Sequence, residues 1–305
     1  MQKAYITALY GLMLGDKRVC SLLSDSGTEY DALIFREFPN RCFNFGIAEE
    51  NKVAAASGLA AFGKIPFVYT TGAFLAYRAY EFIRNDICIQ KSNVKLTGMG
   101  TGMGWSTLGP SHHTTEDISA LRALPNLTLF IPASPMELQA CVKAAYEIEG
   151  PVYIRMCMHD NDEIYDAGYT FVPGKNIVLA NGSEIVVFST GSIVSEGLAA
   201  TKLLEEKGVS VRFVNVHTLK PLDKENIIAV AKDVRHIFTL EEHTVLGGLG
   251  GAVAEVLAEA GLGVPVKRIG LNDCFAAGYG TQAEVKKMNG LDSAHIFNKI
   301  WEAIK

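Results

Sequence analysis

The sequence lacks several features that would place it in a specialised class. Its 305 residues contain no run of about 18 apolar residues, so we expect no membrane span. The net charge of −5 gives no basic surface for nucleic acid or for anionic lipid. Residues 1–18 lack a cationic head before the apolar stretch, which predicts an amphipathic helix and no signal peptide. The six cysteines form no CxxC pair, which argues against a disulfide framework or zinc site and favours a reducing cytoplasm.

What is present indicates a two-domain α/β chain. The length suits two domains of about 150 residues each. Short apolar runs alternate with longer segments of helical spacing, which predicts mostly parallel sheets covered by helices on both faces. A polar, acidic stretch interrupts this rhythm. We therefore expect a first domain over residues 1–157, a linker over 158–178 and a second domain over 179–305.

The expected elements follow from the periodicity of the apolar residues. In the first domain we expect strands at 19–23, 65–70, 94–97, 127–131 and 152–155, and helices at 49–62, 74–90 and 135–148. In the second domain we expect strands at 184–190, 209–215, 237–241 and 264–270, and helices at 195–207, 223–234, 252–260 and 295–304.

Two adjacent carboxylates stand at the start of one expected helix. Residues 44–51 read NFGIAEEN, so that Gly46 makes a turn and both Glu49 and Glu50 enter the first helical turn. Neighbouring helical residues point about 100° apart, so the two side chains cannot serve one site together. Spacing alone leaves two interpretations open: a catalytic carboxylate, or acids stabilised by the positive end of the helix dipole.

Two histidines follow a Gly-Pro turn in the stretch 109–118, GPSHHTTEDI. His112 and His113 precede an expected helix, where a histidine can act as a general acid or base or as a hydrogen-bond donor. Alternatively, Ser111 or Thr114 caps that helix and both histidines lie in solvent. The other histidines show no ligand spacing, so we expect no metal site in this chain.

Two glycine clusters resemble nucleotide-binding loops only superficially. The first, GMGTGMG at 98–104, does not complete the GxGxxG fingerprint and lacks the acidic residue that should follow it. We expect a loop whose backbone passes close to a ligand or a partner. The second, at 247–251, is expected to be a tight turn from a strand to a helix.

Taken in order, these segments resemble the C-terminal half of transketolases and of the related deoxyxylulose-phosphate synthases. The stretches that carry the resemblance are GIAE at 46–49, GLA at 58–60, RAYEFIR at 78–84, GPSH at 109–112, RALPN at 122–126, LKPLD at 219–223 and EEH at 241–243. The resemblance implies a pyrimidine-binding domain, a smaller α/β C-terminal domain and thiamine diphosphate as cofactor. It also implies transfer of a two-carbon ketol unit from a ketose to an aldose.

The resemblance assigns cofactor roles to four residues. Glu49 matches the glutamate that shares a proton with the pyrimidine nitrogen N1′, a task suited to a carboxyl group in an apolar site. Phe74 matches the side chain that stacks on the pyrimidine ring, although residues 69–74 run one residue longer than the usual pattern. Asp25 and Tyr77 fall at positions near the cofactor.

On the substrate side the sequence departs from the ordinary pattern. His112 matches the histidine that faces the substrate, with His113 beside it. Leu108 replaces an aspartate that hydrogen-bonds a sugar hydroxyl, which leucine cannot do. Met158 falls where a phosphate-binding arginine is expected, although Arg155 stands nearby. We therefore expect a modified sugar, or a donor whose phosphate lies elsewhere.

The metal-binding part of the family pattern is missing. The chain has no Gly-Asp-Gly, through which the family binds the diphosphate with magnesium; the nearest stretch is GDK at 15–17. We expect an N-terminal partner subunit to bind Mg²⁺ or Ca²⁺ and the diphosphate in an α2β2 assembly. Alternatives are the β subunit of a 2-oxo acid dehydrogenase, a deoxyxylulose-phosphate synthase-like enzyme, and a non-catalytic assembly subunit.

Overall fold

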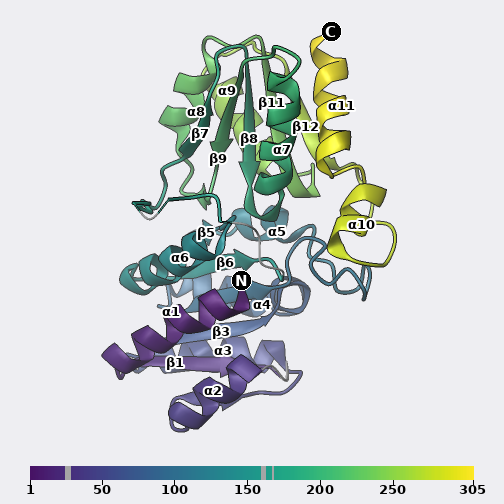
Figure 1. The fold of residues 1–305 in the computed structure, drawn as a ribbon. Helices are drawn as coiled ribbons and strands as arrows, with labels where there is room; N and C mark the ends of the chain where they lie inside the picture. Colours follow the sequence, from purple (N-terminus) through teal and green to yellow (C-terminus); the bar gives the residue numbers. More distant parts are fainter. Residues whose placement is uncertain (25–28, 159–162, 167) are drawn as a thin grey trace.

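The computed structural model covers residues 1–305 and describes residues 1–24, 29–158, 163–166 and 168–305. Two α/β units lie end to end, with the amino-terminal unit below and the carboxyl-terminal unit above in Figure 1. The predicted fold class is confirmed. Within the described residues, the helices are too short or too polar to cross a lipid bilayer.

The lower unit is built on a seven-stranded sheet in the order β10-β5-β6-β4-β3-β1-β2. Six neighbouring strands are parallel, and β10 runs antiparallel to β5. The strands are β1 (Val19–Leu23), β2 (Cys42–Asn44), β3 (Ile65–Thr71), β4 (Lys95–Met99), β5 (Thr128–Phe130), β6 (Val152–Met156) and β10 (Thr218–Lys220). The helices are α1 (Gln2–Gly15), α2 (Glu29–Glu37), α3 (Glu49–Ala61), α4 (Tyr80–Phe82), α5 (Asp117–Arg122) and α6 (Pro135–Glu147), with the π-helical segments η1 (Phe74–Arg78) and η2 (Ile83–Ile89).

The upper unit has a five-stranded sheet in the order β12-β11-β8-β9-β7, parallel except for β7. Its strands are β7 (Ile177–Asn181), β8 (Ile185–Thr190), β9 (Val211–Asn215), β11 (His236–Thr244) and β12 (Val266–Leu271). Its helices are η3 (Gly191–Ile193), α7 (Val194–Glu205), α8 (Lys224–Ala231), α9 (Leu249–Glu259), α10 (Gln282–Met288) and α11 (Ser293–Ile304).

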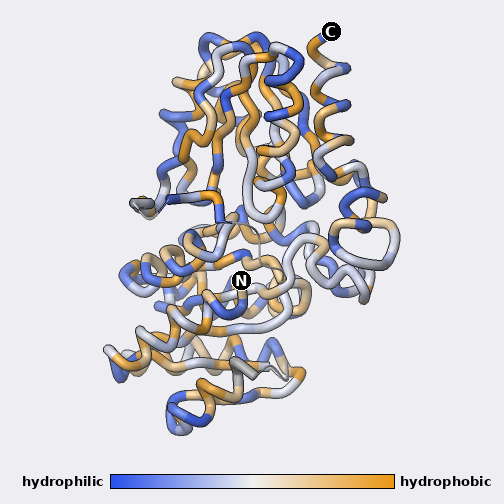
Figure 2. Tube along the Cα trace, viewed as in Figure 1, coloured by the Kyte–Doolittle hydropathy of each residue, from blue (hydrophilic) through white to orange (hydrophobic). Residues whose placement is uncertain are grey.

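Burial explains why the central strands are continuous apolar runs. Strands β1, β4, β6 and β8 are buried at every position, as expected for parallel strands covered on both faces. In the lower unit, α1 and α6 pack together on one face of the sheet. Helix α3 and segment η2 pack on the other face. Apolar segments accordingly concentrate along the strands inside each unit (Figure 2).

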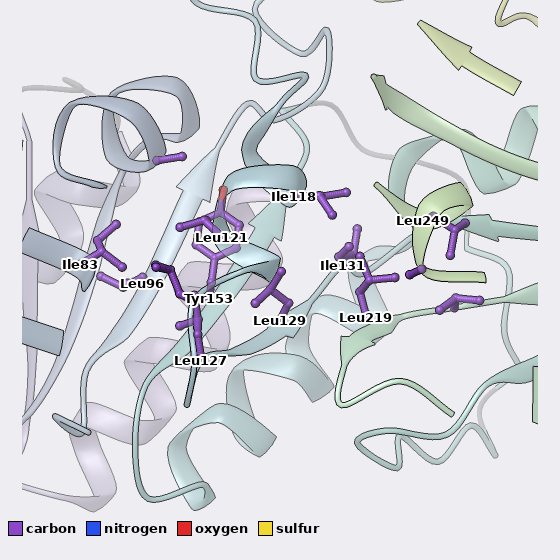
Figure 3. Packing of buried hydrophobic residues seen from close by; sticks show 14 of the residues in the cluster. Ile83, Leu96, Ile118, Leu121, Leu127, Leu129, Ile131, Tyr153, Leu219 and Leu249 are labelled. Atoms are coloured by element: carbon purple, nitrogen blue, oxygen red, sulfur yellow. The ribbon is translucent and has the colours of Figure 1, made fainter. Parts of the chain in front are cut away.

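The two units share one continuous apolar core. Strand β10 lies in the carboxyl-terminal part of the sequence, yet it completes the sheet of the lower unit by pairing with β5. Leu219 on β10 and Leu249 on α9 belong to the same buried cluster as Leu129 and Tyr153 of the lower sheet. Figure 3 shows this cluster extending from Ile83 toward Leu249. The sequence did not predict β10, β7, α2 or α10.

The segment between the units is bound to both of them. Tyr165 and Tyr169 stack with ring centroids 3.9 Å apart. Their hydroxyls donate to Oε1 of Glu137 on α6, at 2.8 and 3.0 Å. Asn215 on β9 donates to the same carboxylate at 3.1 Å. Burial raises the pKa of Glu137, although these donors oppose the shift. The described part of the linker is therefore packed structure.

A second buried carboxylate, Glu242 on β11, joins the units on the other side. Its Oε1 accepts from the backbone N–H of Met103 at 2.6 Å, and its Oε2 from the Ser192 hydroxyl at 2.6 Å. Burial raises the pKa of Glu242, but Lys286 at 3.6 Å and these donors outweigh it, so the pKa lies below its ordinary value. Gly102 has a φ of +64°, and a Cβ there would lie 2.6 Å from Glu242 Oε1. The lack of a side chain at Gly102, in the glycine-rich loop 98–104, therefore leaves room for the Glu242 carboxylate.

Replacing Glu242 by leucine should lower the free energy of unfolding by about 3–5 kcal/mol, because Lys286 and the Met103 N–H lose their buried partner. Chemical denaturation measures this loss. Glu255→Gln is the control, since Glu255 pairs with Arg122 at the surface and should cost less than about 1 kcal/mol. Equal losses for the two variants would contradict the assignment of Glu242 as a junction between the units.

Candidate active site

The candidate site, which includes the predicted residues Glu49 and Phe74, lies where the parallel strands of the lower sheet end. Ser24 follows β1, Glu49 follows β2 at the start of α3, and Phe74 follows β3. Strand β1 lies between β2 and β3, so these three carboxyl ends are neighbours. Crevices outside the carboxyl ends of parallel strands are the usual ligand sites of such sheets.

Glu49 is buried, with 1% of its surface exposed, and its two carboxylate oxygens have different neighbours. Oε1 lies 3.3 Å from the hydroxyl of Thr70 on β3. Oε2 accepts from Nη1 of Arg78 at 2.7 Å. The Arg78 side chain is 40% exposed, so Oε2 faces the open side of the site and Oε1 faces the interior. Glu50 is only partly buried and does not share this environment.

Arg78 and Phe74 together connect Glu49 with the histidine motif. The Arg78 guanidinium lies over the Phe74 ring, 5.0 Å from its centroid. The His112 ring meets the same phenylalanine edge-on at 5.1 Å. The predicted continuous helix over 74–90 is wrong in detail, because η1 and η2 are π-helical. Such wide turns often occur at functional sites. Here the π-helical segment η1 brings the Arg78 guanidinium over the Phe74 ring.

The histidine motif forms a turn and does not cap a helix. His112 is partly buried, and its Nδ1 lies 3.0 Å from the Ser111 hydroxyl. His113 is buried, and both of its ring nitrogens lack a hydrogen-bond partner among the described residues. Burial lowers the pKa of His113, which favours a neutral ring. The alternative interpretation, in which Ser111 or Thr114 caps the next helix, is wrong: α5 begins at Asp117 without a side-chain cap.

Tyr77 and Leu108, also predicted near cofactor and substrate, are partly exposed at 40% and 45%. The Tyr77 hydroxyl donates to Glu116 Oε2 at 2.7 Å and accepts from the Glu116 N–H at 3.0 Å, which fixes η1 to the loop before α5. Leu108 presents an apolar side chain just before the histidine motif. Asp25 lies outside the described residues.

Arg155 was predicted to bind substrate, but it is buried and hydrogen-bonds only to other groups of the protein among the described residues. It is 3% exposed on β6, and its Nε donates to both oxygens of Asp117 at 3.0 Å. Its Nη2 donates to the carbonyl oxygens of Thr114 and Glu242 at 2.8 and 3.1 Å. Tyr153 donates to the same aspartate at 2.9 Å. Arg155 therefore fixes the loop after the histidine motif from below.

Lys52, Thr70, Ser24 and Arg78 belong to the site, although none of them was predicted to have a role there. Lys52 stands one turn after Glu49 on an alanine-rich helix, and a lysine on that face was the one available signal. The Thr70 hydroxyl lies 2.9 Å from the Ser24 hydroxyl, to which Lys52 Nζ also donates. Thr70 could not be recognised because its relation to Glu49 depends on the pairing of the sheet.

Two family models match the chain and define its class. Residues 1–160 match the transketolase pyrimidine binding domain, and residues 174–296 match the transketolase C-terminal domain. The chain belongs to the transketolase family, whose cofactor is thiamine diphosphate. Within the described residues, no group of three His, Cys, Asp or Glu side chains could hold a metal ion.

Individual relatives refine this membership. The chain is 39% identical to a Methanocaldococcus jannaschii protein named as a transketolase C-terminal section, covering 100% of this chain and 96% of that protein. It is 38% identical to one subunit of the apulose-4-phosphate transketolase of Actinobacillus succinogenes, over 87% and 85% of the two chains. A solved split gene transketolase, described as an inactive β4 tetramer, superimposes with a TM-score of 0.88 at 37% identity, over 99% and 96% of the chains.

The environment of Arg155 leads to a prediction. Arg155→Met should lower the free energy of unfolding by about 3–5 kcal/mol, because Asp117 is left as an uncompensated buried charge. The double variant with Asp117→Asn should recover part of this loss, because the buried charge is then removed. Thermal unfolding of the single and the double variant measures both effects. A substrate-binding arginine would behave differently: the single variant would keep its stability and lose only substrate affinity.

Proposed function

We propose that this chain is the C-terminal subunit of a split, thiamine diphosphate-dependent transketolase. It would supply Glu49, Phe74 and His112 to an active site completed by an N-terminal subunit. The reaction is transfer of a two-carbon ketol unit from a ketose to an aldose. The observation that carries this proposal is a buried carboxylate joined through Arg78 to a partly buried aromatic ring, at the carboxyl ends of parallel strands.

The contacts of Arg78 support the fit of the cofactor's pyrimidine ring. A planar, nitrogen-bearing group here lies over the Phe74 face and hydrogen-bonds Glu49 Oε2. An aminopyrimidine that stacks on a phenylalanine and binds a glutamate needs the same two contacts. The donor set of this chain therefore suits the group, and Arg78, being partly exposed, has room to move aside.

When bound, thiamine diphosphate supplies the carbon that attacks the ketose and accepts the electrons of the broken C–C bond. Glu49 holds and returns one proton at Oε2. Its position suits this task, because Oε2 contacts the Arg78 guanidinium, which lies over the Phe74 ring where the pyrimidine ring is proposed to stack. Phe74 orients the ring plane. Tyr77, fixed to Glu116, holds the π-helical turn that carries Phe74.

The histidine motif is assigned to the substrate. His112 lies against the edge of Phe74, so it borders the position proposed for the cofactor and can hydrogen-bond the ketose. The two ring nitrogens of the buried His113, unpartnered among the described residues, mark a second polar group available beside it. Leu108 supplies an apolar wall where the family pattern has an aspartate. This favours a sugar that lacks one of the usual hydroxyl contacts. Arg155 is not proposed as a phosphate ligand, because it is buried and paired with Asp117.

Several observations support an N-terminal partner that binds the diphosphate with Mg²⁺ or Ca²⁺. The chain lacks the family's Gly-Asp-Gly. Apolar side chains next to the site are exposed, including Ile47 at 75%, two residues before Glu49. The Actinobacillus relative is named as a subunit, and the solved split relative is described as an inactive tetramer of β chains. An α2β2 assembly with sites between unlike subunits accounts for all of these.

The role of Glu49 can be tested in the reconstituted pair of subunits. Glu49→Gln keeps the size of the side chain but cannot exchange a proton, so ketol transfer should fall by about 10²–10⁴-fold. The matched control is Glu50→Gln, which alters the adjacent carboxylate and should leave the rate within about twofold. Coupled assays with sugar phosphate donors measure both. An unaffected rate in Glu49→Gln would favour a non-catalytic assembly subunit.

Dependence on the partner gives a separate test. The chain alone should show no ketol transfer and only weak binding of thiamine diphosphate, because it holds the pyrimidine side and not the diphosphate. Adding the N-terminal subunit with Mg²⁺ should restore both, as measured by calorimetry and activity. Pyruvate and lipoamide serve as alternative substrates. Decarboxylation of pyruvate, or reductive acylation of lipoamide, would replace the proposed reaction by one of its two enzymatic rivals.

A further inference from the structure

A buried lysine lies behind Glu49, on the side away from the open site. Lys52 has 0% of its surface exposed and stands on α3, one helical turn after Glu49. Its Nζ donates to the Ser24 hydroxyl and, at 3.4 Å, to the carbonyl oxygen of Tyr69. Burying an ammonium group is costly. Such a residue in an otherwise alanine-rich segment therefore calls for a physical reason.

Hydrogen bonds connect this lysine to Glu49. The Ser24 hydroxyl lies 2.9 Å from the Thr70 hydroxyl, which lies 3.3 Å from Glu49 Oε1. The series Lys52, Ser24, Thr70, Glu49 is thus continuous from a cation to a carboxylate. We call it the Lys52 relay. It joins α3 to the carboxyl ends of β1 and β3, so it exists only in the folded sheet.

The chemistry of the groups shows which of them donate within the relay. An ammonium group can only donate, and an ionised carboxylate can only accept. The Thr70 hydroxyl has one hydrogen and two neighbouring acceptors, Ser24 Oγ and Glu49 Oε1. The single Thr70 hydrogen is therefore shared between Ser24 Oγ and Glu49 Oε1, while Lys52 donates to the same Ser24 oxygen. Donation to the carboxylate is favoured because a charge-assisted hydrogen bond is about twice as strong as a neutral one.

We propose that Lys52 is a positioning residue for Glu49, acting through Ser24 and Thr70. The relay engages Oε1 from the interior and leaves Oε2, which faces Phe74 and Arg78, as the oxygen that exchanges the proton. This rests on the proposed function, in which Glu49 is the proton-exchanging group. Lys52 itself touches neither substrate nor cofactor in this assignment.

The protonation of Lys52 is consistent with this coupling. Burial lowers the pKa of Lys52 to about 7, and the charge of Glu49 acts in the opposite direction. Lys95 on β4 is a natural control within the same chain. Its pKa is also lowered to about 7 by burial, but the opposing charge is Glu149, and its Nζ donates to the carbonyl oxygens of Ile148 and Gly150.

The coupling can be measured on the full chain without cofactor or partner. Lysine side chains labelled with ¹⁵N are titrated by NMR in the wild type and in Glu49→Gln. The pKa of Lys52 should fall by about one pH unit when the carboxylate charge is removed, whereas that of Lys95 should not move. An unchanged Lys52 titration would overturn the proposal, because it would show that the relay carries no charge coupling.

The positioning role is measured in the reconstituted pair, as deuterium exchange at C2 of bound thiamine diphosphate. Lys52→Met and Thr70→Val should each slow exchange by about tenfold, the loss of one hydrogen bond to a charged group. Thr70→Ser retains the hydroxyl and should restore the rate. Lys95→Met also removes a buried lysine and should leave exchange unchanged, which separates positioning from a general loss of stability.

Two outcomes of this experiment are decisive against the relay. If Lys52→Met exchanges as fast as Lys95→Met, or if Thr70→Ser is as slow as Thr70→Val, Lys52 does not position Glu49. Failure of the proposed function has a different signature: Glu49→Gln would itself exchange at the wild-type rate. In that case the NMR coupling would still be present, but the role of the relay in proton exchange would be overturned.

Discussion

The structure depends on the burial of one carboxylate at the carboxyl edge of a parallel sheet. A charged group away from water requires partners, and Glu49 has a cation on its open side and a hydroxyl on its interior side. The neighbouring elements supply these partners: β3 provides Thr70, the π-helical turn provides Arg78, and α3 provides the lysine behind them. The helix start, the strand end and the irregular turn are therefore parts of one electrostatic arrangement.

Buried acids also hold the two units together. Glu137 binds two linker tyrosines and Asn215, and Glu242 binds the glycine-rich loop 98–104 and η3. Asp117 orients Arg155 within the lower unit, and Arg155 in turn donates to the Glu242 carbonyl oxygen of the upper unit. Each is saturated by donors, as buried polar groups in native proteins usually are. The residues proposed to face the substrate thus rest on a support whose components come from both halves of the sequence.

The sequence predicted the regular part of this architecture well, since apolar runs such as 19–23 and 152–155 are buried on both sheet faces and leave little ambiguity. Glu49, Phe74 and His112 were found through a resemblance, and the structure brings them together. Strand β10, the π-helical turns and the environment of Arg155 were not predictable. They depend on long-range pairing: Thr218 with Phe130, and Arg155 with Asp117.

Strand β10 has a consequence for how this chain can be divided. The boundary between the two family domains, at residues 160–174, precedes β10 in the sequence. The residues of β10 nevertheless form the outer edge of the amino-terminal sheet, next to β5. A fragment that stops at the boundary would expose the backbone donors and acceptors of β5 to other molecules, and unprotected edges of this kind promote aggregation. The two family domains are therefore separate in sequence, but the first does not have a complete sheet without a strand from the second. Fusion or excision experiments should keep residues 218–220 with the amino-terminal half.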